Sequence, residues 1–198
     1  MKRTFSWLTL TLTVLVAIAN ANSSAPPEEK RMKPALLVID IQSEYLKMVP
    51  EQEKGMALYM INAAINLFRM KGYPIIRVYH TDPQFGPKPG SEEFEFPVSV
   101  LIKPDDPKII KNYANGFKKT ELDKLLHEQG CNTLFLCGLS AVGCVLATYQ
   151  GAMDLDYDAF LIKNALMSHN SEYTKAIEDI FAALSYNALQ VMLANAQK

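Results

Sequence analysis

The chain has 198 residues, of which 49% are hydrophobic, and this is enough for one domain with a buried core. Lys and Arg number 20 against 21 Asp and Glu, a formal net charge of −1. Because no excess of positive charge is available to attract phosphate backbones, we exclude nucleic acid as an expected partner.

The N-terminal segment has the pattern of an export signal. Lys2 and Arg3 precede an apolar run over residues 7–19, and Ala19-Asn20-Ala21 supplies the small residues that signal peptidase recognises. An uncleaved membrane anchor is the alternative, but the run is shorter than the roughly 20 residues of a spanning helix. We therefore expect residues 1–21 to be a signal peptide, cleaved near Ala21, and the mature protein to be periplasmic or secreted without a membrane association.

Residues 22–33 are polar and contain prolines, which is typical of a linker or disordered arm. We expect the folded domain to span residues 34–198. It opens with an apolar run at 35–39 that ends at Asp40, as a strand buried on both faces does. Apolar residues at helical spacing follow over residues 56–70.

Strand and helix patterns then alternate to the end of the chain. We expect strands at 75–79, 108–110, 133–137, 159–162 and 188–193, and helices at 121–127, 142–154 and 172–184. Residues 81–107 hold most of the prolines and form a long loop, and loops of this length usually serve a function. The alternation predicts an α/β fold of three layers, Rossmann-like, with a mostly parallel central sheet of about six strands and helices on both faces.

Three residues with chemical potential follow predicted strands. In open α/β sheets the active site lies beyond the carboxyl ends of the strands. Asp40 follows the first strand, Lys111 the third, and Cys144 lies a few residues after the fourth. Each also has a plain structural interpretation: a turn or cap aspartate, a surface lysine, and an inert core cysteine.

Cys144 has the strongest chemical position of the three cysteines. It is expected at the start of a helix, where free N–H groups and the helix dipole favour a thiolate and could stabilise an oxyanion. Cys131 and Cys137 flank one strand and would lie on the order of 20 Å apart along it. Since a disulfide needs Cα atoms within about 7 Å, we interpret both as structural.

Metal binding is not indicated. The three histidines are scattered, and none is paired with another ligand at the close spacing of a metal site. We therefore expect no metal and no cofactor. His80, at the end of a predicted strand, is a candidate for contact with a substrate.

Three segments together resemble one family. Residues 35–42 (ALLVIDIQ), residues 111–117 (KNYANGF) and residues 138–145 (GLSAVGCV) resemble the strand, lysine and cysteine motifs of the isochorismatase-like cysteine hydrolases, the superfamily of isochorismatase, nicotinamidase and carbamoylsarcosine amidase. The likeness extends over essentially the whole mature chain.

The resemblance implies a catalytic triad. In it Cys144 is the nucleophile, Asp40 the general base and Lys111 the cation between them. The N–H groups of Ser140 and Cys144 would form the oxyanion hole, after a cis peptide bond that precedes Ser140. The implied reaction is hydrolysis of a C–N bond in a small molecule through a thioester, by a homo-oligomer. We also expect four substrate contacts: Gln42, Tyr45, His80 and Phe117.

The chain departs from the family pattern without losing a triad residue. Asn115 stands where Ser is frequent, Ala141 where Thr is frequent, and Asn164-Ala165 replaces Asp-Ala. His80-Thr81-Asp82 lacks the full metal motif of nicotinamidases. The alternatives are an isochorismatase-type ether hydrolase, a redox-sensing member or a catalytically silent member.

Overall fold

The computed structural model describes residues 31–84 and 86–196. The predicted signal peptide and most of the predicted arm lie outside these residues. The central sheet has five strands in the order β3-β2-β1-β4-β5, and every neighbouring pair is parallel. Among the described residues, none of the helices has the length and apolar character needed to cross a membrane.

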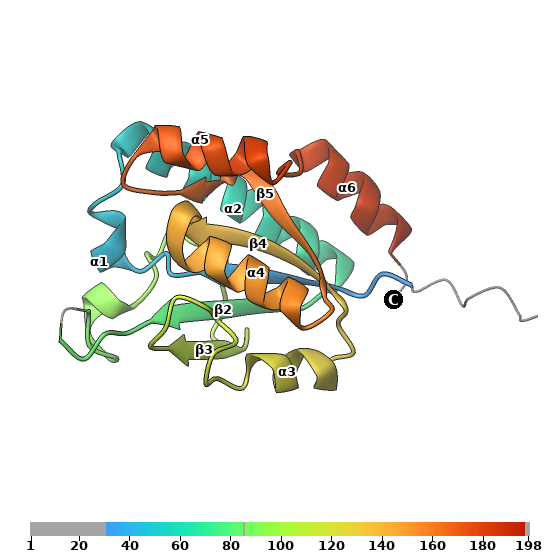
Figure 1. Cartoon of the computed structure of the whole chain (residues 1–198), viewed down its shortest axis with the longest axis horizontal. Coiled ribbons are helices and arrows are strands. Elements are labelled where there is room, and N and C mark those ends of the chain that lie inside the picture. The colour runs from blue at the N-terminus through green and yellow to red at the C-terminus, as the bar shows by residue number, and fades with distance from the viewer. Residues whose placement is uncertain (1–30, 85, 197–198) are drawn as a thin grey trace, which may run out of the picture. The chain divides into compact units, whose positions relative to one another are not determined.

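From β1 to α5, strands and helical segments follow one another in the predicted order (Figure 1). The strands are β1 (Pro34–Ile39), β2 (Ile75–His80), β3 (Lys108–Lys111), β4 (Thr133–Leu139) and β5 (Asp158–Met167). The helices are α1 (Ser43–Leu46), α2 (Glu51–Lys71), the 3-10 turn η1 (Glu92–Phe94), α3 (Leu122–Glu128), the π-helical turn η2 (Ala141–Val145), α4 (Leu146–Asp154), α5 (Ser171–Ile180) and α6 (Tyr186–Asn195).

Both faces of the sheet are buried, which confirms the predicted three-layer α/β class. All six residues of β1 are buried, and their side chains alternate between two cores. Leu36 and Val38 pack in the core formed with α2 and α6. Leu37 and Ile39 pack in the core formed with α3, α4 and α5. The strand is therefore apolar throughout because neither of its faces reaches water.

The predicted sixth strand is wrong. Residues 188–193 lie in α6, whose start is capped by the Ser185 hydroxyl, which accepts the Ala188 N–H. Leu189 and Leu193, one helical turn apart, are buried, whereas Val191 is 62% exposed. A strand would place all three on one face, so burial of a helical stripe decides between the two structures. Leu184 forms an isolated bridge to Ile162 beside the edge of the sheet.

Two boundaries also differ from expectation. The folded domain includes residues before Pro34, because the Asn132 side chain accepts the Lys33 N–H and donates to the carbonyl oxygen of Arg31. Strand β5 continues to Met167 rather than ending at residue 162. Its register against β4 shifts at a bulge, where Asn164 adopts a φ of 60°. The polar residues of this bulge interrupt the apolar pattern, so the sequence indicated a shorter strand.

The long loop after β2 is anchored to α2 through Asp106. Arg69 donates to both carboxylate oxygens, at 3.0 and 2.9 Å, and the Lys103 N–H donates to one of them at 2.6 Å. Arg77 also donates to the backbone carbonyl of Asp106. Burial by itself would raise the pKa of Asp106, but the hydrogen bonds from Arg69 and Lys103 outweigh it and hold that pKa below its usual value.

We expect Asp106→Asn to lower the free energy of unfolding by about 2 kcal/mol at neutral pH, because charge-assisted hydrogen bonds are lost. A carboxyl with a lowered folded-state pKa stabilises the fold above its unfolded pKa, and this contribution disappears as the pH falls through the folded pKa. The difference between wild type and variant should therefore shrink below the ordinary Asp pKa of 3.8. Urea unfolding at pH 7, 5 and 3 measures it, with the exposed neighbour Asp105→Asn as control. An equal difference at all three pH values would contradict the ionic anchor.

Candidate active site

The order of the strands creates a crevice between the carboxyl ends of β1 and β4. The chain builds the sheet from β1 outward to β3 and then crosses to β4 on the other side of β1. Such a reversal is where open α/β sheets bind ligands. Asp40 follows β1 directly with a φ of 52°, and Ser140 follows β4. Asp40 therefore lies at the edge of the sheet where the site was predicted.

Gly138 allows β1 and β4 to meet closely at this edge. Its φ is +120°, a conformation that L side chains rarely adopt. A Cβ at this position would overlap the carbonyl oxygen of Ile39, the residue before Asp40. A glycine is therefore required where the backbones that carry the two halves of the site come together.

Lys111 and Asp40 form a buried ion pair. The distance from Lys111 Nζ to Asp40 Oδ2 is 2.6 Å, and the two side chains are 0% and 4% exposed. The alternative interpretation of Lys111 as a surface lysine is therefore excluded. Because desolvation offsets most of the attraction in a buried pair, such a pair is weak evidence for stability. It does hold the carboxylate in one orientation.

Cys144 completes the group from the turn η2. Its sulfur, a carboxylate oxygen of Asp40 and a ring nitrogen of His80 all lie within 4.8 Å of one another. The second carboxylate oxygen of Asp40, Oδ1, is buried and has no hydrogen-bond partner among the described residues. The structure thus brings together all three predicted catalytic residues and His80.

Burial disfavours the thiolate form of Cys144 in the resting site. Burial raises the pKa of Cys144 to about 12, and the charge of Asp40 raises it as well, while Lys111 opposes both. Burial also raises the pKa of Asp40, and Lys111 only partly offsets this rise. Lys111 lowers the pKa of Cys144, the direction expected from the sequence, but burial and the charge of Asp40 outweigh it. Burial dominates, and the thiol needs a base at the moment it reacts.

The turn that carries Cys144 is closed by its own backbone. The Leu139–Ser140 peptide bond is cis, as the resemblance implied. The N–H groups of Gly143 and Val145 donate to the carbonyl oxygen of Ser140, at 2.9 and 3.1 Å. This arrangement holds Cys144 at the start of the helical segment that continues into α4. An oxyanion hole formed by the N–H groups of Ser140 and Cys144 stays a prediction.

Thr148 connects the cysteine turn to the lysine segment. Its hydroxyl donates to the carbonyl oxygen of Cys144 at 2.7 Å and accepts the N–H of Gly116 at 2.9 Å. Sequence reasoning did not include Thr148 in the site. A signal was present, because Thr148 lies one helical turn after Cys144 and is a polar residue on the buried side of its helix.

The four predicted substrate contacts separate into different roles. The Gln42 side-chain amide forms hydrogen bonds with the backbone N–H and carbonyl oxygen of His80, so Gln42 supports the site. The Tyr45 hydroxyl is buried without a hydrogen bond from the described residues, and its ring lies 5.9 Å from that of His80. Phe117 stacks on Tyr157 at 5.8 Å and packs against a core cluster, which favours a packing role.

Known proteins match the chain along most of its length. The Isochorismatase domain family matches residues 34–190. An isochorismatase family protein of Bacillus subtilis, YddQ, is 32% identical over 143 residues, which cover 68% of this chain and 77% of that protein. This chain belongs to the isochorismatase family.

Two further relatives have names that state an activity. Maleamate amidohydrolase of Pseudomonas putida is 34% identical over 62 residues, covering 31% of this chain and 29% of that enzyme. The crystal structure of N-carbamoylsarcosine amidase from Thermoplasma acidophilum superposes with a TM-score of 0.67 at 25% identity, covering 78% of this chain and 95% of that one. The fold of this isochorismatase-family hydrolase is therefore shared with a solved relative.

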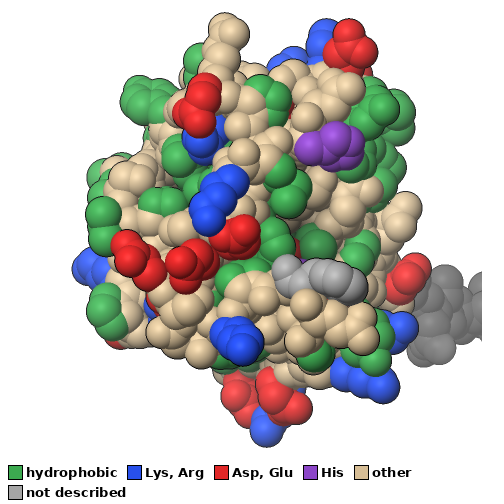
Figure 2. Space-filling view, turned by 90° about the vertical axis from the view of Figure 1, so that its left-hand side faces the viewer, with side chains coloured by type: hydrophobic (Ala, Val, Ile, Leu, Met, Phe, Trp, Pro, Cys, Tyr) green, Lys and Arg blue, Asp and Glu red, His purple; other side chains and the backbone are tan. Residues whose placement is uncertain are grey.

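The surface beyond the carboxyl ends of the strands has no dominant charge. Figure 2 shows this side of the isochorismatase-family domain, with hydrophobic side chains between acidic and basic ones.

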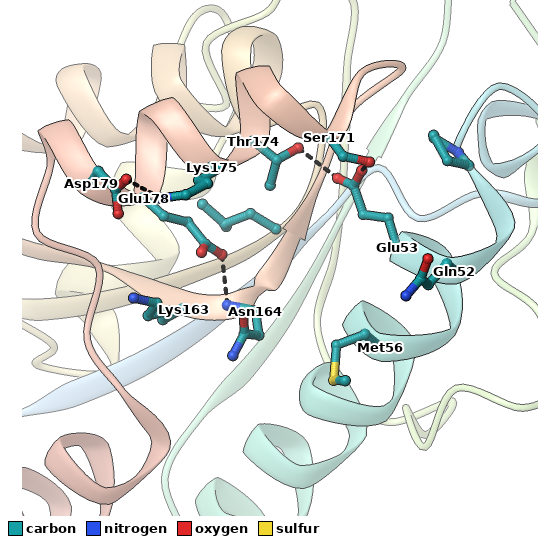
Figure 3. Close-up of a pocket in the computed structure, with 12 residues that line it drawn as sticks. Gln52, Glu53, Met56, Lys163, Asn164, Ser171, Thr174, Lys175, Glu178 and Asp179 are labelled. Carbon is teal, nitrogen blue, oxygen red and sulfur yellow. Dashed lines mark hydrogen bonds and ion pairs between the residues drawn. The ribbon is translucent and has the colours of Figure 1, made fainter.

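A separate hollow of about 530 Å³ lies between α2, β5 and α5 (Figure 3). None of the predicted site residues of this family member lines it. Its acidic side chains hold neighbouring elements together: Glu53 of α2 accepts from Ser171 and Thr174 of α5, and Glu178 accepts the Asn164 N–H at 2.6 Å. The polar side chains around the hollow therefore connect α2 and α5 to each other and α5 to the edge strand β5.

Proposed function

We propose that this isochorismatase-family hydrolase cleaves a C–N bond of a small amide through a thioester on Cys144. The arrangement of Asp40 carries the proposal. One of its oxygens is held by Lys111 at 2.6 Å, and the other is buried without a hydrogen-bond partner among the described residues. A carboxylate oxygen of Asp40 also lies within 4.8 Å of the Cys144 sulfur. A carboxylate fixed in one orientation can act as a general base and accept the proton of the Cys144 thiol when the sulfur attacks.

The proposed reaction has two halves. Cys144 sulfur attacks the amide carbonyl while its proton passes to Asp40, and the N–H groups of Ser140 and Cys144 receive the developing oxyanion. The C–N bond breaks as Asp40 returns the proton to the leaving nitrogen. A water molecule then attacks the thioester, giving its proton to Asp40, which passes it to the departing sulfur. Lys111 keeps Asp40 ionised between these steps.

Two relatives support an amide rather than an ether as the substrate. Their names, maleamate amidohydrolase and N-carbamoylsarcosine amidase, describe C–N bond hydrolysis. Hydrolysis of an enol ether, the alternative, proceeds without an acyl group that could be transferred to sulfur. A thiol held beside a general base would have no covalent role in that reaction.

The test is a panel of primary amides, ureido acids and one enol ether, assayed for ammonia or alcohol release. Reactions with an amide that the protein hydrolyses are quenched in acid within milliseconds, and the protein is analysed by intact-protein mass spectrometry. We expect a population heavier by the acyl group, which peptide mapping places on Cys144. Amide turnover without any acyl-protein, or turnover of the enol ether alone, would contradict the proposal.

Export of the protein is part of the proposal. It is supported by the basic, apolar and small-residue order of residues 1–21, which lie outside the described residues. The intact mass of the protein recovered from the periplasm or medium determines the cleavage point, which we place near Ala21.

A further inference from the structure

We propose that His80 is a positioning residue, whose Nδ1 accepts one ammonium hydrogen of Lys111 and thereby directs another toward the Cys144 thiol. For its effect on turnover the inference rests on the proposed function. Its effect on the thiol can be measured without any substrate.

The backbone places His80 and Lys111 side by side. They are register partners in the parallel ladder of β2 and β3, so their side chains leave the same face of the sheet. The distance from Lys111 Nζ to His80 Nδ1 is 3.3 Å. Lys111 is 1% exposed, so its ammonium depends on protein partners for its hydrogen bonds.

The chemistry of the pair decides the tautomer of His80. An ammonium can only donate, so Nδ1 must present its lone pair and the ring hydrogen must be on Nε2. The imidazole is then neutral. Burial lowers the pKa of His80 to about 4, and the charge of Lys111 lowers it further, while Asp82 opposes them. A neutral ring is therefore the stable form at neutral pH.

Two fixed hydrogen bonds of the Lys111 ammonium determine the direction of its third N–H. It carries three tetrahedral hydrogens, and Asp40 at 2.6 Å and His80 at 3.3 Å account for two of them. The third is then fixed by geometry. The Cys144 sulfur lies within 4.8 Å of a carboxylate oxygen of Asp40 and of a ring nitrogen of His80, the two residues that hold the ammonium. In keeping with this, Lys111 opposes the rise in the pKa of the Cys144 thiol. Without an acceptor at His80, rotation about the Cε–Nζ bond of Lys111 would no longer keep an N–H directed at the Cys144 thiol.

Gln42 holds the imidazole in place for this task. Its amide oxygen accepts the N–H of His80 at 2.7 Å, and its amide nitrogen donates to the carbonyl oxygen of His80 at 2.9 Å. Gln42 is fully buried, so solvent does not compete for either bond. The Tyr45 ring lies 5.9 Å from the imidazole. The position of the acceptor is therefore set by the surrounding residues before a substrate binds.

The experiment compares His80→Leu, which removes the acceptor, with His80→Asn, whose Oδ1 lies as many bonds from the backbone as Nδ1. The matched control is His169→Asn, at an exposed histidine. The rate constant for alkylation of Cys144 by iodoacetamide is measured by intact mass between pH 6 and 9. In parallel, kcat and KM are measured on an amide that the wild type hydrolyses.

We expect His80→Leu to slow alkylation of Cys144 about tenfold and to lower kcat about tenfold, with KM changed less than about threefold, as loss of one charge-assisted hydrogen bond predicts. His80→Asn should recover both rates to within about threefold of wild type, and His169→Asn should match wild type. If His80→Leu does not fold, judged by its melting temperature, His80→Ala replaces it.

Two results would overturn the inference: alkylation as fast in His80→Leu as in wild type, or alkylation as slow in His80→Asn as in His80→Leu. Failure of the proposed function looks different. In that case the alkylation rates follow the expected order, but wild-type protein hydrolyses no amide.

Discussion

Replacing Cys144 with alanine should lower kcat for amide hydrolysis by on the order of 10⁴-fold or more, as removal of a covalent nucleophile does in other hydrolases. The reason is local. Asp40 and Lys111 keep their 2.6 Å ion pair in the variant, but no atom remains to form the thioester. Because the thiol is only half-buried, its loss should leave the fold unchanged.

Initial rates of ammonia release and a thermal melt together measure this result. The control is Cys131→Ala, which removes a different buried thiol outside the site and should keep wild-type turnover. A Cys144→Ala variant that retains even a tenth of the activity would end the covalent mechanism and return enol-ether hydrolysis to consideration.

Replacing Gly138 with alanine should lower the free energy of unfolding by more than about 4 kcal/mol, enough to prevent folding in many domains. The new methyl group would overlap the carbonyl oxygen of Ile39, and the φ of +120° would strain any L side chain. Backbone atoms, not flexible side chains, oppose the substitution, so β1 and β4 would have to separate at the site.

Gly55→Ala is the matched control, because Gly55 lies in helix α2 with open space where a Cβ would be placed. Alanine there should stabilise the protein by roughly 0.5–1 kcal/mol through helix propensity and a less flexible unfolded chain. Soluble yield and urea unfolding of both variants measure the difference. Normal stability of Gly138→Ala would show that the two strands can move apart at low cost.

The sequence alone was sufficient for the fold class and for the expectation that Asp40, Lys111 and Cys144 lie at one edge of the sheet. Apolar runs such as residues 35–39 indicate strands buried on both faces, and this pattern is local in the chain. The final strand was predicted wrongly because residues 188–193 fit either period. Only packing, which buries Leu189 and Leu193 and exposes Val191, selects the helix.

For the site too, the sequence predicted some features and missed others. The positions of Asp40, Lys111 and Cys144 after strands predicted where they would gather, because parallel strands end at a common edge. The sequence did not predict their electrostatics. The helix start and Lys111 favoured a thiolate, but burial raises the pKa of Cys144 to about 12, and burial depends on residues distant in sequence.

What the sequence by itself determined is therefore the order of the elements as far as β5 and the helix after it, their apolar faces and the kinds of reactive group at the sheet edge. Only the tertiary structure decided which atoms face one another: the Asp40 oxygen held by Lys111, the oxygen that has no hydrogen-bond partner in the described part of the chain, and the His80 nitrogen at 3.3 Å from the lysine. The physical reason is that the periodicity of a segment records which side is buried, whereas a pKa or a hydrogen bond depends on distances of a few ångströms between segments far apart in the chain.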